Sequence, residues 1–105
     1  MIEVSKAAAE QILASARENN LLGMALRIAV KRDPQGNFQY AMGFEDNITE
    51  EDKTIQSNGV EIVVSPFSEE LLKGTVLDYV EVEGEQEKQF VFINPNDPNC
   101  TVKPD

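Results

Sequence analysis

Histidine and tryptophan are absent from this sequence of 105 residues, and cysteine occurs only once, as Cys100. A single thiol cannot form a disulfide within the chain. Without histidine, the chain also lacks the commonest general base and the commonest metal ligand. This inventory excludes zinc enzymes and hydrolases with a Ser–His–Asp or Cys–His arrangement, so we expect a protein that is not an enzyme.

Basic residues are also scarce. Nine lysines and arginines stand against 19 aspartates and glutamates, which gives a formal net charge of −10. Such a surface repels nucleic acid phosphates, and no basic patch offsets it, so we expect no nucleic acid partner. An acidic, well-solvated surface is the simplest interpretation, and a basic protein partner is the alternative.

Long hydrophobic runs are missing as well. Apolar stretches such as "GMALRIAV" are far shorter than the roughly 20 residues of a membrane-spanning helix. The first residues, "MIEVSKAAAE", do not combine a basic region with an apolar run, as a secretory signal would. We therefore expect a cytoplasmic protein that does not associate with membranes.

Two segments have the pattern of helices. In residues 5–20, Ser5 is a suitable N-cap, and an apolar stripe recurs at spacings of three and four: Ala9, Ile12, Leu13 and Ala16. In "SPFSEELLKG", Ser65 can cap a second, short helix, Pro66 suits its first turn, and Gly74 can end it.

The remaining apolar segments alternate with a period of two, as strands do. Residues 26–31 and 38–45 predict a hairpin around the turn "RDPQGN", Asn58-Gly59 predicts a tight turn, and "TVLDYVEVEG" and "KQFVFIN" predict a final strand pair. We expect an α+β fold of mostly antiparallel or mixed sheets, with one longer N-terminal helix and one short helix. The alternating stripe of the second strand is expected to face the core, with an exposed partner surface as the alternative: Phe38, Tyr40, Met42 and Phe44.

Two polar segments interrupt this pattern. The acidic run "FEDNITEED" at 44–52 lacks the alternating ligands and central glycine of a calcium loop, so a solvated loop is favoured over a cation site. The end of the chain, "NPNDPNCTVKPD", holds three of the five prolines and no periodicity. We predict one domain over residues 1–96 and a flexible C-terminal tail over residues 97–105.

Three stretches carry a resemblance to a known family: "LRIAV" at 26–30, "GVEIVVSPFSEELLKGTVLDYV" at 59–80 and "FVFINPN" at 90–96. In their order and spacing they resemble the A-type iron–sulfur cluster carriers, also called HesB-like or IscA-like proteins. The resemblance covers nearly the whole chain and implies the HesB-like fold. It also implies three ligand cysteines, one in the turn after the first long strand and two just beyond Asn-Pro-Asn.

This sequence departs from that ligand pattern. Gln35 stands where the first cysteine would fall, Cys100 lies one residue before the first position of the pair, and the second position has no cysteine. Cys100 is therefore the one candidate metal ligand, as a relic ligand of iron or of an iron–sulfur cluster. The alternative is a free thiol on the tail.

The resemblance implies a role in iron–sulfur cluster assembly, as an accessory or carrier-like protein with a degenerate metal site. A [2Fe–2S] cluster normally needs four thiolates, so we expect no resident cofactor, with transient iron or a transient [2Fe–2S] cluster at paired Cys100 residues of a homodimer as the alternative. The expected partners are proteins, among them those of iron–sulfur assembly. A metal-free interaction or regulatory module on the same scaffold is the second hypothesis.

Overall fold

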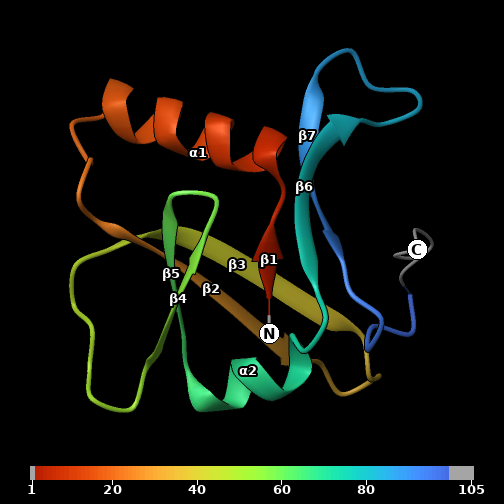
Figure 1. Ribbon diagram of the computed structural model, residues 1–105. Coiled ribbons are helices and arrows are strands. Elements are labelled where there is room, and N and C mark those ends of the chain that lie inside the picture. Colours follow the sequence, from red (N-terminus) through yellow and green to blue (C-terminus); the bar gives the residue numbers. More distant parts are fainter. Residues whose placement is uncertain (1, 100–105) are drawn as a thin grey trace.

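Helix α1 (Lys6–Glu18) begins at Ser5, whose hydroxyl accepts a hydrogen bond from the backbone amide of Ala8. The computed structural model describes residues 2–99 (Figure 1). One face of α1 is buried, as the apolar stripe predicts, because Ala9, Ile12 and Ala16 point into the core. The short helix α2 (Pro66–Leu71) is capped by Ser65 with proline at its start, so both predicted helices are confirmed.

Within residues 2–99, seven strands form two mixed sheets, and Figure 1 shows how the helices lie against them. The four-stranded sheet has the order β3-β2-β5-β4, and the three-stranded sheet has the order β1-β6-β7. Helix α1 contacts β6 and β5, one strand of each sheet, and α2 contacts β2. The strands are β1 (Glu3–Val4), β2 (Ala25–Arg32), β3 (Phe38–Glu45), β4 (Lys53–Ser57), β5 (Val60–Val64), β6 (Val76–Glu81) and β7 (Lys88–Ile93).

The predicted strand pairs are confirmed: β2–β3, β4–β5 and β6–β7 are all antiparallel. Asn58 and Gly59, both with positive φ, form the turn between β4 and β5. The sequence pattern gave no sign of β1, because a strand of two residues is too short to show alternation. It also did not reveal the parallel pairs β1–β6 and β2–β5, which join segments far apart in the chain.

The core lies between the two sheets and beneath α1. Its completely buried side chains come from four different strands: Val4, Ile28, Ile62, Val64 and Leu77 are among them. The stripe on β3 faces this core as predicted at Phe38, which is buried, and at Tyr40 and Phe44, which pack against it while partly exposed. Met42 is 37% exposed. Because β3 is an edge strand, only one strand borders it and its side chains are less covered than those of β2.

Candidate functional site at the hairpin turn and the C-terminal segment

The turn between β2 and β3 is fixed by Asp33. Its Oδ1 accepts hydrogen bonds from the backbone amides of Gln35 and Asn37, both at 2.9 Å. The Asn37 amide, together with that of Gln35, lowers the pKa of the Asp33 carboxyl below its ordinary value. Asp33 is therefore a fixed negative charge at this turn.

Gln35 lies exposed in the middle of this turn. Its side chain is a neutral amide, which is a hard and weak donor toward iron. The turn that should carry the first ligand cysteine, according to the family resemblance, is thus formed and accessible but has no thiol. At this position the local structure of the turn is present, and only the thiol side chain is missing.

Asn94 follows the last residue of β7 and is completely buried. Its Nδ2 donates to the carbonyl oxygen of Leu71 at 2.9 Å and to the hydroxyl of Tyr40 at 3.2 Å. Its Oδ1 accepts from the backbone amide of Asn96 at 2.9 Å. One side chain thereby joins the end of α2, strand β3 and the segment that leaves β7, and each of its polar atoms has a partner.

Pro95 and Asn96 hold the segment that follows β7 against the residues just after α2. Nδ2 of Asn96 donates to the carbonyl oxygen of Lys73 at 2.7 Å. Pro95 packs against Gly74, where a β-carbon would lie 3.4 Å from the proline ring and where φ is +76°. Glycine at position 74 therefore supplies the left-handed turn after α2 against which Pro95 lies.

Tyr40 ties the C-terminal segment to β3. Its ring stacks on Phe92 of β7, with the centroids 4.4 Å apart and the planes at 4°. Its hydroxyl donates to Oδ2 of Asp97 at 2.7 Å. Tyr40 and Phe92 lie on the edge strands of different sheets, so this stack closes one side of the core and sets the direction in which the chain leaves it.

Asn99 then brings the segment to the hairpin turn. Its Nδ2 donates to Oδ1 of Asn37 at 2.5 Å. Asn37 is two residues after Gln35, and Asn99 is the residue before Cys100. Cys100 itself lies outside the described residues, as does most of the tail predicted at 97–105, so its role as a ligand and the flexibility of the tail stay predictions.

The donor set does not fit a stable cluster held by one chain. A [2Fe–2S] cluster is normally held by four thiolates, or by two thiolates and two histidines. This chain has one cysteine and no histidine. Within residues 2–99, no three side chains of the types His, Cys, Asp and Glu form a group that could hold a metal ion.

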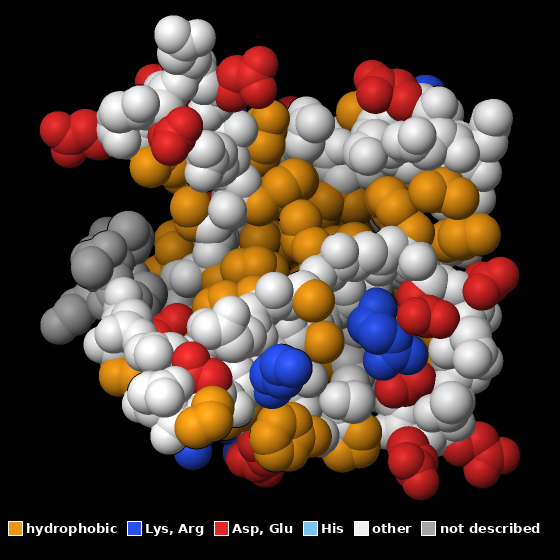
Figure 2. Space-filling model, turned by 180° about the vertical axis from the view of Figure 1, so that it is seen from behind, with side chains coloured by type: hydrophobic (Ala, Val, Ile, Leu, Met, Phe, Trp, Pro, Cys, Tyr) orange, Lys and Arg blue, Asp and Glu red, His pale blue; other side chains and the backbone are white. Residues whose placement is uncertain are grey.

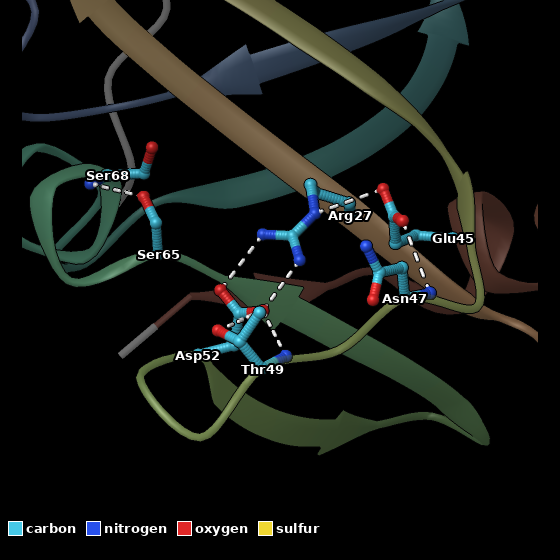
Figure 3. A network of polar contacts seen from close by, with 7 residues as sticks. All are labelled: Arg27, Glu45, Asn47, Thr49, Asp52, Ser65 and Ser68. Carbon is cyan, nitrogen blue, oxygen red and sulfur yellow. Dashed lines mark hydrogen bonds and ion pairs between the residues drawn. The ribbon is translucent and has the colours of Figure 1, made fainter.

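Two carboxylates of the acidic run 44–52, those of Glu45 and Asp52, are engaged within the protein (Figure 3). Arg27 on β2 forms a bidentate pair with Asp52, at 3.1 and 2.7 Å, and also contacts Glu45 at 3.3 Å. The Arg27 guanidinium holds the pKa of the Asp52 carboxyl well below its usual range, with help from the Thr49 amide. Asp52 of this loop is thus paired with an arginine and is not free to bind a cation.

The sequence pattern does not predict the polar network of Tyr40, Asn94, Asp97 and Asn99. Tyr40 has the spacing of a core residue, which conceals the role of its hydroxyl. Asn94 carried a usable signal, because an asparagine directly after an apolar strand is well placed to bind free backbone groups.

None of the helices within residues 2–99 is long and apolar enough to cross a membrane.

Known proteins are similar to this chain in both sequence and fold. The profile of the family described as "Iron-sulphur cluster biosynthesis" matches residues 1–103. The iron-sulfur cluster insertion protein ErpA of Photorhabdus laumondii is 40% identical over 86 residues, which cover 82% of this chain and 71% of that protein. A protein of Aquifex aeolicus is 41% identical over 80 residues, 76% of this chain and 69% of its own.

Solved structures have the same fold as this chain. The crystal structure of IscA with the [2Fe-2S] cluster is 31% identical, with a TM-score of 0.70 over 90% of this chain and 86% of that one. Escherichia coli SufA, at 23% identity, shows the same fold with a TM-score of 0.74, over 95% of this chain and 88% of its own. The predicted resemblance and the predicted fold class are both confirmed, and this chain belongs to the iron–sulfur cluster biosynthesis family.

Proposed function

We propose that this protein is a non-enzymatic accessory protein of cytoplasmic iron–sulfur cluster biosynthesis that acts through protein partners and binds iron or a cluster weakly or not at all. One observation carries the proposal: the scaffold of the family is kept, but the turn at Gln35 has no thiol and the chain has only one cysteine. Any cluster would be cargo and not a resident cofactor.

The arrangement of the described residues supports a degenerate site over an unrelated surface. Asn99 contacts Asn37, and Asp97 contacts Tyr40, so the segment leading to Cys100 is held beside the β2–β3 turn. The two segments to which the family resemblance assigns ligands are thus neighbours in this chain. The chain lacks the number of thiols that a [2Fe–2S] cluster normally requires.

Anaerobic reconstitution with iron and sulfide tests this proposal. We expect the wild-type protein to hold much less than one cluster per two chains, and Cys100→Ser to abolish whatever visible absorption develops. Gln35→Cys would give two thiols per chain and four per homodimer, the number that a [2Fe–2S] cluster requires. We therefore expect Gln35→Cys to become strongly coloured.

The matched control is Gln86→Cys, which places a thiol at another exposed glutamine, in the β6–β7 turn. It should stay as pale as the wild type. A stoichiometric, stable cluster in the wild type would refute the proposal of weak binding. Equal behaviour of Gln35→Cys and Gln86→Cys would show that the hairpin turn and the tail do not form one site.

The low thiol count favours a second candidate, a metal-free interaction or regulatory module on the same scaffold. It predicts that no iron is bound under any of these conditions and that the Cys100→Ser protein keeps all its partners in pull-down experiments. Under the first candidate, partners from cluster assembly should be captured better by iron-treated wild-type protein than by Cys100→Ser.

A further inference from the structure

A groove opens between the C-terminal half of α1 and the β4–β5 hairpin, at the end of β2 opposite to the hairpin turn. We call it the α1–β5 groove. Its volume is about 220 Å³. Figure 2 shows a hollowed band of hydrophobic side chains running beneath α1, toward the C-terminal end of that helix. The groove is lined by Ile12, Leu13, Ala16, Leu22, Gly23, Met24, Leu26, Phe44, Gln56, Gly59, Val60 and Glu61.

The wall of the groove is apolar and its rim has an acidic group. Leu22 is 58% exposed and Met24 is 37% exposed, which are high values for large apolar side chains. Among the described residues, no lysine or arginine lines the groove. Glu61 accepts a hydrogen bond from Nε2 of Gln56 at 3.2 Å, and no lysine or arginine of residues 2–99 forms a salt bridge with it. Its charge is thus available to a cation from outside.

The size of the groove selects the kind of occupant. Pockets for cofactors and drug-sized molecules usually enclose about 300–1,000 Å³, more than this groove offers. A volume near 220 Å³ suits one or two large apolar side chains presented by another polypeptide. Binding of this kind is typical of grooves that accept anchor residues of a helix or an extended segment.

We propose that the α1–β5 groove binds a basic segment of a partner protein, which inserts a large apolar side chain beside Leu22 and places a lysine or arginine against Glu61. The net charge of −10 attracts such a segment from a distance. A second copy of this chain is a poor occupant, because it would bring the same charge and the same acidic rim. This inference does not depend on Cys100 or on iron, so it goes beyond the proposed function.

The probe is a labelled 12-residue peptide of lysine and leucine with helical spacing, together with a counterpart in which glutamate replaces lysine. Fluorescence anisotropy gives the affinity, and ¹H–¹⁵N spectra of the labelled protein give the location. Leu22→Ser and Glu61→Gln change the groove at accessible positions. Phe67→Ser, at a 64% exposed apolar residue on α2, and Glu83→Gln, at an exposed carboxylate in the β6–β7 turn, are the matched controls.

We expect the lysine–leucine peptide to shift amide signals mainly in residues 12–26 and 56–61. Leu22→Ser should weaken binding about tenfold, because a leucine side chain loses its burial against the peptide. Glu61→Gln should weaken binding about threefold and reduce its dependence on salt. Phe67→Ser and Glu83→Gln should bind as the wild type does.

Four results would overturn the proposal: no binding, equal binding of the glutamate–leucine peptide, equal weakening by the control variants, or signal changes centred elsewhere. A wild-type dimer that Leu22→Ser converts to a monomer would also overturn it, in favour of a second copy as the occupant. Light scattering of both proteins gives that answer. None of these results depends on cluster reconstitution, so failure here is distinct from failure of the proposed function.

Discussion

Replacing Asn94 by aspartate changes the buried centre of the network that anchors the C-terminal segment. The new side chain has nearly the same shape, but in its ionised form it lacks the donor that binds the carbonyl oxygen of Leu71 at 2.9 Å. An ionised carboxylate would place negative charge against that carbonyl in a site with no exposure to water. Burying such a charge costs several kcal/mol, so the folded variant is expected to keep the acid protonated instead.

The cost follows from the pKa of the introduced acid. An aspartate in the unfolded chain has a pKa of about 3.9, and each pH unit above this value costs about 1.36 kcal/mol when the folded state keeps the proton. The loss of stability relative to the wild type is then roughly 2 kcal/mol at pH 5.5 and roughly 4 kcal/mol at pH 7. Because the folded-state pKa is raised, the variant loses stability as the pH rises.

Urea unfolding followed by far-ultraviolet circular dichroism at pH 5.5 and pH 7 measures these differences. Asn94→Ala is the control: it removes the hydrogen bonds that Nδ2 donates and also those that Oδ1 accepts from Asn96, and it leaves a small cavity, for a loss of about 2–3 kcal/mol that does not vary with pH. A loss below about 1 kcal/mol for Asn94→Asp at pH 7, or an equal loss at both pH values, would refute the burial and bonding described for this side chain.

Three further predictions concern other parts of the fold. The lowered pKa of Asp52 stabilises the protein above the unfolded-state pKa of about 3.9, and this stabilisation is lost as the pH falls toward the folded-state pKa. Asp52→Asn should therefore reduce the loss of stability at acid pH, measured by urea unfolding at a series of pH values. An unchanged loss would contradict the pairing of Asp52 with Arg27. Ser5→Ala removes both the N-cap of α1 and the 2.6 Å hydrogen bond to Asp78, and should cost about 1–2 kcal/mol, whereas Ser15→Ala in the last turn of α1 should cost less than about 0.5 kcal/mol. Ile62→Ala empties a completely buried position at the centre of the four-stranded sheet and should cost about 3–4 kcal/mol, with Ile48→Ala at a 41% exposed position nearly neutral in the same thermal or chemical unfolding assay.

Local chemistry explains why most elements could be predicted from the sequence. Ser5 and Ser65 each offer a hydroxyl to a free backbone amide, and this requirement is met within three residues along the chain. Asn58-Gly59 forms the β4–β5 turn because both residues tolerate positive φ, again a local property. The alternation in β2 and β3 reflects one buried face, although it could not show that β3 would be an edge strand with Met42 exposed.

The candidate site was predictable only in part, because its partners are distant in the chain. The sequence determined that Gln35 lies in a hairpin turn, that one thiol is present, and that four thiolate ligands cannot come from one chain. Only the tertiary structure decided that Asn94 would bind Leu71 and Tyr40, and that Asn99 would meet Asn37, 62 positions away. Turns and caps depend on neighbouring residues, whereas these contacts depend on how two sheets pack, and that packing is set by the whole core.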